Sequence, residues 1–183
     1  MKKTLILLAL LPSAAFAHSG HQTGSFGSGF AHPFSGADHL LAMVALGLLA
    51  AQVGGRAVWA LPLAFVAAML AGGAMGAGGL GFPAVEPLIL ASVMVLGAMV
   101  ALALRPATHA LLAMAALFGA AHGWAHGAEG PATGLPVYAV GFAVATAALH
   151  GLGMLAGKAI PALAIRGAGA LAALTGAALA LAG

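Results

Sequence analysis

Long apolar runs, separated by short breaks rich in glycine, proline or charge, dominate this sequence. A helix needs about 20 residues to cross the hydrocarbon of a bilayer, and most of the runs approach that length. The pattern therefore predicts an all-α, polytopic membrane protein with a single six-helix transmembrane domain over residues 18–183. The six predicted helices cover residues 34–53, 57–77, 88–105, 107–126, 134–157 and 162–183.

Residues 1–17 form a different kind of segment. Lys2 and Lys3 precede a short apolar stretch, and Ala15-Phe16-Ala17 provides the small residues of a cleavage site. This arrangement predicts an N-terminal signal peptide that is removed after Ala17. The mature chain would then begin at His18 on the exported side, where His18 and His21 are weaker candidates for capturing a metal ion.

Composition supports the membrane assignment and narrows the possible partners. The 183-residue chain is 63% hydrophobic and only 5% charged, against about 25% charged residues in an average soluble domain. The formal charge of +3 is not concentrated in a basic patch, so we expect no nucleic-acid partner. With an exported N-terminus, all four basic residues of the mature chain fall in or beside cytoplasmic loops, as the positive-inside rule requires. We therefore expect a multi-pass membrane protein with both termini on the exported side. The four basic residues are Arg56, Arg105, Lys158 and Arg166.

The first group of candidate site residues lies where the first predicted helix begins. His32, Asp38 and His39 precede a nearly unbroken apolar run. A buried aspartate costs about 2.5–3.5 kcal/mol on insertion scales, so a bound cation is a natural compensator. In a continuous helix His32 and His39 would be separated by about 10 Å along the axis. They would share one ion only if the helix start is irregular, which Gly36 would permit; otherwise they mark two stations.

A second group lies at the end of the fourth predicted helix. His122, His126 and Glu129 follow the spacing i, i+4, i+7 and so share one helical stripe. The same histidine spacing occurs in zinc proteases, but those require glutamate directly after the first histidine, and here that residue is Gly123. His150, inside the fifth predicted helix, either faces the same cavity or serves as an interhelical hydrogen-bond donor.

The chain contains no cysteine, so any metal site must use nitrogen and oxygen ligands, with thioether ligation left open by eight methionines. Such ligands suit nickel, cobalt, zinc or Cu(II). The two groups together predict a divalent-ion site at the outer ends of two helices.

The two motifs resemble those of the HupE/UreJ family of nickel/cobalt transporters. His-Pro-x-x-Gly-x-Asp-His is matched by His32, Pro33, Gly36, Asp38 and His39, and His-Gly-x-x-His-Gly-x-Glu is matched from His122 to Glu129. The resemblance implies a secondary permease or facilitator that takes up Ni²⁺ or Co²⁺ as its cargo, not an enzyme. It also implies no permanently bound cofactor and an indirect supply of nickel to hydrogenase or urease. A member of this family is expected in the bacterial inner membrane, here with both termini on the periplasmic side.

Two other interpretations remain open at this level. One is a membrane b-type cytochrome with histidines as axial haem ligands. Asp38 beside His39 and the His122/His126/Glu129 stripe fit this interpretation poorly. The other is a metal sensor that binds an ion without moving it.

Overall fold

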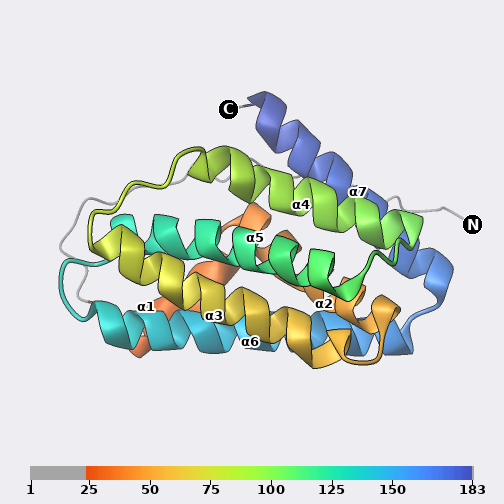
Figure 1. Ribbon diagram of the computed structural model, residues 1–183, viewed down its shortest axis with the longest axis horizontal. Helices are drawn as coiled ribbons and strands as arrows, with labels where there is room; N and C mark the ends of the chain where they lie inside the picture. The colour runs from red at the N-terminus through yellow and green to blue at the C-terminus, as the bar shows by residue number, and fades with distance from the viewer. Residues whose placement is uncertain (1–23, 183) are drawn as a thin grey trace, which may run out of the picture.

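The computed structural model describes residues 24–182, so the predicted signal peptide, His18 and His21 lie outside the described residues. The described range contains helices and turns but no strand, which confirms the predicted all-α class. A short helix α1 and a 3-10 turn η1 precede six longer helices (Figure 1). Their bounds are α1 Phe26–Ala31, η1 His32–Phe34, α2 Ala37–Val53, α3 Ala57–Ala77, α4 Val85–Leu102, α5 Thr108–Ala128, α6 Leu135–Ala159 and α7 Ala162–Ala182.

The six predicted runs correspond one to one to α2 through α7, with ends that differ by at most three residues. The largest difference with a functional consequence is at the first run. The sequence predicts a helix from residue 34, whereas α2 begins at Ala37 after a break at Ser35 and Gly36. The chain before this break is bent by 83° relative to α2.

Four helices are long and apolar enough to span a membrane by themselves: α3, α4, α6 and α7. The bent pair of α1–η1 and α2 gives a fifth span if it counts as one. Helix α2 alone has 17 residues, and α5 has 21 residues but carries His122 and His126, which lower its mean hydropathy. The described residues therefore support a membrane protein with four to five spans and do not confirm the predicted six.

Helix α2 lies at the centre of the bundle. The most extensive contacts join α3 to α5, α4 to α7, and α2 to α6, while α2 also contacts α3, α4 and α7. In Figure 1, α4 and α7 lie along one side and α6 along the other, with α3 and α5 between them. Both helices that carry the predicted site motifs, α2 and α5, are thus covered by more apolar neighbours.

Glycines let the site-bearing helices approach their partners closely, as is usual in membrane helix packing. A Cβ atom on Gly123 of α5 would meet the carbonyl oxygen of Met69 in α3, and one on Gly127 would meet that of Gly73. In the α2/α6 pair, a Cβ on Gly47 would meet the carbonyl oxygen of His150. These contacts fix α5 against α3, and α2 against α6, at backbone distance.

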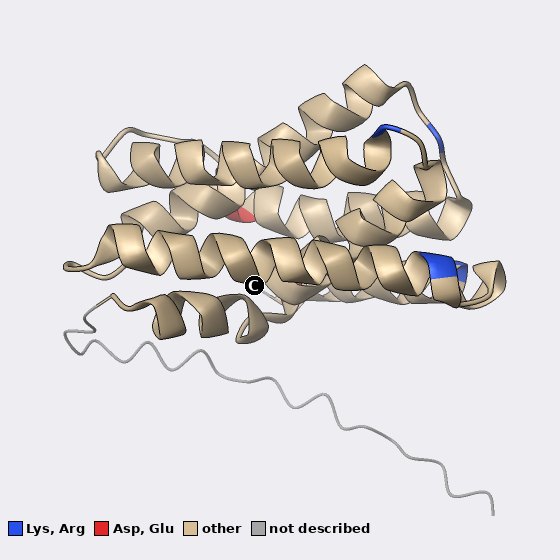
Figure 2. Cartoon of the chain, turned by 90° about the horizontal axis from the view of Figure 1, so that it is seen from below, with Lys and Arg blue, Asp and Glu red and all other residues tan. Residues whose placement is uncertain are grey.

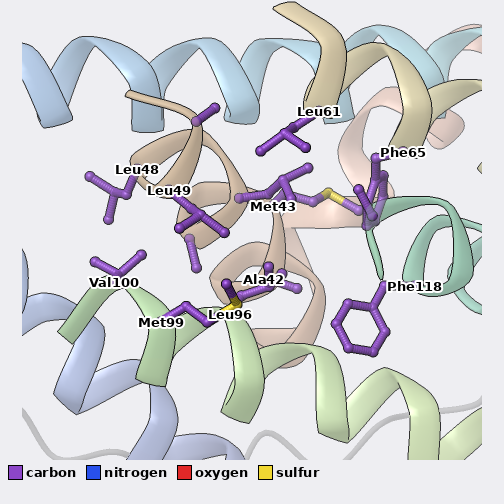
Figure 3. Packing of buried hydrophobic residues seen from close by; sticks show 14 of the residues in the cluster. Ala42, Met43, Leu48, Leu49, Leu61, Phe65, Leu96, Met99, Val100 and Phe118 are labelled. Carbon is purple, nitrogen blue, oxygen red and sulfur yellow. The ribbon is translucent and has the colours of Figure 1, made fainter. Parts of the chain in front are cut away.

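A hydrophobic core fills the space around α2. Met43 and Leu49 of α2, Phe65 of α3 and Leu96 of α4 are all fully buried, and Phe118 of α5 closes the same cluster (Figure 3). The first turn of α2 lies just beyond this core, and it is there that the polar residues begin.

Charge marks the two ends of the bundle. The Lys and Arg positions lie at one end of the bundle in Figure 2, where the chain passes from α2 to α3, from α4 to α5 and from α6 to α7. Glu86 in the first turn of α4 and Glu129 at the C-cap of α5 fall at the other end by connectivity. We call this second end the outer end.

Candidate metal-binding site

The break before α2 turns His32 toward the rest of the site. Pro33 stands at the start of η1, and the backbone N–H of Ser35 closes the turn on the carbonyl oxygen of His32 at 2.9 Å. The turn brings the ring centroids of His32 and His39 to 6.4 Å, less than the axial separation expected of an unbroken helix. The irregular start that the sequence permitted is therefore present.

Gly36 has a different role from the one that its flexibility suggests. Its backbone is extended, with φ −110° and ψ 127°, a conformation open to any residue. What matters is space, because a Cβ atom at Gly36 would stand 2.7 Å from Oδ1 of Asp38. The missing side chain leaves room for the carboxylate.

Asp38 orients His39. Its Oδ1 lies 3.0 Å from Nδ1 of His39 and also accepts the backbone N–H of His39 at 2.9 Å. A carboxylate only accepts hydrogen bonds, so the neutral imidazole carries its proton on Nδ1 and presents a lone pair at Nε2. This is the usual way in which a carboxylate prepares a histidine for a metal ion.

That lone pair meets a histidine from α5. Nε2 of His39 lies 2.6 Å from Nε2 of His126, so His126 donates when both rings are neutral. Two nitrogen ligands at about 2.1 Å from one ion stand at least about 3 Å apart, so the pair must separate slightly to share a metal. Over residues 24–182, no three histidine or acidic side chains are arranged to hold one ion as they stand.

His122 lies one turn deeper in α5 and is fully buried. Its Nδ1 lies 2.9 Å from the carbonyl oxygen of Phe118, which can only accept, so the proton is on Nδ1. Its Nε2 has no hydrogen-bond partner in the described part of the chain. The ring centroids of His122 and His39 are 4.8 Å apart, so a histidine with a free lone pair stands beside the His39/His126 pair.

Aromatic side chains of α6 line the outer side of the cluster. The ring of His32 lies 4.6 Å from that of His126 and 5.8 Å from that of Tyr138, and Phe142 lies 4.3 Å from His126. A cavity of about 230 Å³ between α3, α5 and α6 reaches His126 and is otherwise lined by apolar or small residues together with Tyr138. The imidazoles therefore meet in a space that is partly shielded from water. In such a space, the replacement of an ion's water ligands by nitrogen has its largest effect on the free energy of binding.

The other predicted residues lie apart from this cluster, which we define as His32, Asp38, His39, His122 and His126. Glu129 is exposed at the C-cap of α5, near the outer end. His150 is fully buried, but the ring of Phe65 stands next to it at 5.1 Å and next to His122 at 5.5 Å. Sequence reasoning did not single out Phe65 or the Phe118 carbonyl; only the i, i+4 spacing of Phe118 and His122 was available as a signal.

Comparison with known proteins agrees with the two motifs. The family model described as HupE / UreJ protein matches residues 6–182. This chain belongs to the HupE/UreJ family. It is 46% identical over 162 residues to Protein HupE of Rhizobium leguminosarum bv. viciae, an alignment that covers 84% of this chain and 81% of that protein. No solved structure gives a significant match.

Membership of the HupE/UreJ family confirms the resemblance found in the motifs. The family consists of membrane proteins of the nickel/cobalt transporter type and not of enzymes, so neither the cytochrome nor the non-transporting sensor is favoured. Apolar helices that span the bilayer fit that assignment.

Proposed function

We propose that this protein takes up divalent nickel, and cobalt as the closest alternative, across the inner membrane through the cluster of His32, Asp38, His39, His122 and His126. The ion is cargo and not a resident cofactor. The observation that carries the proposal is the meeting of His39 and His126 at 2.6 Å, because it joins the two motifs from α2 and α5.

The donor chemistry supports this cargo. Imidazole nitrogen with a nearby carboxylate suits the later divalent transition metals better than Mg²⁺ or Ca²⁺, which prefer all-oxygen sites. Asp38 supplies the one negative charge in the cluster and so offsets charge where water is scarce.

Entry of the ion would proceed by exchange of hydrogen bonds for metal bonds. Separation of His39 from His126 frees Nε2 of His39, which Asp38 already holds in the right tautomer. Nε2 of His122 is free of any partner in residues 24–182, so it accepts the ion without breaking a bond. Glu129, exposed near the outer end, would attract the incoming cation.

The orientation of the bundle follows from its charges. We propose that the basic end faces the cytoplasm and that a cleaved signal peptide delivers the N-terminus to the periplasm. The sequence has no phosphate-binding loop, so the chain itself acts as a secondary permease or facilitator. The nickel it admits would supply an enzyme such as hydrogenase or urease.

Uptake of radioactive nickel by cells carrying Asp38→Asn or His39→Ala tests the proposal. Loss of a ligand or of its orienting partner commonly costs about 10–100-fold in metal affinity or activity, so both variants should transport at least about tenfold less. The control is His109→Ala, since His109 is exposed at the start of α5, far from the cluster. Wild-type uptake by both variants would overturn the proposal, and competing cobalt, zinc and copper would rank the cargo.

A further inference from the structure

His150 is a buried histidine that the cluster does not use. It stands within α6 with no exposed surface, and neither of its ring nitrogens has a hydrogen-bond partner in the described range. A buried polar group without a hydrogen-bond partner destabilises the fold, so two such nitrogens on one ring require an explanation. A ligand that arrives only during the working cycle would account for it.

Two side-chain contacts between α3 and α6 define the surroundings of His150. The ring of Phe65 lies 5.1 Å from that of His150 at an angle of 88°. One turn closer to the outer end, the hydroxyl of Thr146 lies 3.7 Å from Sδ of Met69. Because the two helices run in opposite directions and each pair is four residues apart, Met69 and Thr146 stand directly above Phe65 and His150.

Phe65 packs against both His150 and the outer cluster. Its ring centroid lies 5.5 Å from that of His122 and 5.1 Å from that of His150, and it is fully buried. In the described part of the chain the four outer imidazoles have ring contacts with one another, whereas the ring contact of His150 is with Phe65. Met69 connects the surroundings of His150 to the outer cluster, because Met69 also lines the cavity that reaches His126.

We propose that His150, Met69 and Thr146 form a second ion station, deeper than the outer cluster and distinct from it. The proposal rests on the proposed function and extends it from one site to two. A nitrogen, a thioether sulfur and a hydroxyl form a softer donor set than the outer imidazoles with Asp38. Such a set favours later transition metals and disfavours Mg²⁺, Ca²⁺ and Mn²⁺, so this station contributes to selectivity.

Replacement of His150 by leucine gives the first test, on the purified full-length protein and in cells. Nickel uptake should fall by about tenfold or more, as for other losses within metal sites. The nickel affinity of the outer cluster should remain at the wild-type value, because His150 is not among its ligands. The thermal midpoint should not decrease, because leucine removes two unsatisfied nitrogens. A merely structural histidine would instead lower the thermal midpoint and the uptake together.

Methionine and threonine variants test the station independently of His150. In X-ray absorption spectra of the nickel-loaded protein, a sulfur neighbour should be present in the wild type and lost in Met69→Leu. Met43→Leu is the matched control, because Met43 is also buried in the core but stands on α2, outside the α3/α6 contact that holds Met69 and Thr146. Thr146→Val should lower uptake, whereas Ser92→Ala should not, since the Ser92 hydroxyl is satisfied by the carbonyl oxygen of Ile89 in its own helix.

The outcomes separate the two proposals. Wild-type uptake by His150→Leu, or nickel spectra without sulfur in the wild type, would overturn the second station while leaving His39-dependent uptake intact. A fall in the outer nickel affinity of His150→Leu would also overturn it, because His150 would then belong to the cluster. Failure of the proposed function would appear differently, as wild-type uptake in the Asp38 and His39 variants.

Discussion

His39 and His126 face each other nitrogen to nitrogen at 2.6 Å, although 87 positions separate them in the chain. The contact joins the first turn of α2 to the last turn of α5. It engages the Nε2 atoms of both rings, which an ion at the proposed site would need, so in our proposal it represents the closed form of the cluster. Whatever opens this contact controls access to the ligands.

Replacing His126 by phenylalanine should test that contact. Phenylalanine keeps a ring between His39 and Phe142 but supplies no nitrogen, so we expect nickel uptake to fall by about 10–100-fold. The protein should still accumulate in the membrane, because the ring packing with Phe142 is retained. His109→Phe is the control, as it makes the same change at an exposed position. Uptake that survives in His126→Phe would remove α5 from the site.

Adding a methyl group at Gly36 should disturb Asp38 without removing it. In Gly36→Ala the new Cβ atom would crowd Oδ1 of Asp38, which must then shift away from His39. We expect uptake to fall by up to about tenfold, the low end for loss of a residue that orients a metal ligand. Gly27→Ala, on α1, is the control because its Cβ atom would meet only the Ser25 hydroxyl at 3.9 Å. Equal uptake in the two variants would show that Asp38 tolerates displacement.

The close crossing of α3 and α5 should be sensitive to a single methyl group. In Gly123→Ala the Cβ atom would run into the carbonyl oxygen of Met69, and overpacking of this kind usually costs about 1–3 kcal/mol. We expect a lower thermal midpoint in detergent. Gly151→Ala should leave it unchanged, because nothing lies within 4 Å of the added atom. A midpoint unaffected in Gly123→Ala would mean that the two helices cross less closely than described.

The absence of cysteine gives a clean background for testing the orientation. A membrane-impermeant maleimide should label Ala132→Cys, in the exposed loop after α5, in intact cells. It should label Ala107→Cys, in the exposed loop before α5, only after permeabilisation. The reverse pattern would place the cluster on the cytoplasmic side and overturn the proposed orientation.

Much of this architecture could be predicted from the sequence because apolar runs between Gly, Pro and charged breaks determine where membrane helices begin and end. The residues of α3 were predicted as found. The meeting of His39 with His126 could be expected only in outline, from motifs at helix ends on one side of the membrane. The contact between His150 and Phe65 could not be predicted, because it depends on how α3 and α6 pack. No local sequence pattern encodes the packing of these two helices.

The break at Ser35 and Gly36 is a second feature that the sequence pattern does not predict. Apolar and polar periodicity carries no signal for a bend of 83° in a segment that is polar at its start. Glycine suggested irregularity through flexibility, whereas its role in the fold is to leave space beside a carboxylate. Spatial requirements of that kind become visible only when the neighbouring atoms are known.

The two helices that carry the cluster are also the two that are too short or too polar to qualify as spans alone. We expect the stable insertion of each to depend on the helix packed most extensively against it, α6 for α2 and α3 for α5. A variant that weakens either pairing would therefore reduce the amount of protein in the membrane before any effect on transport could be measured.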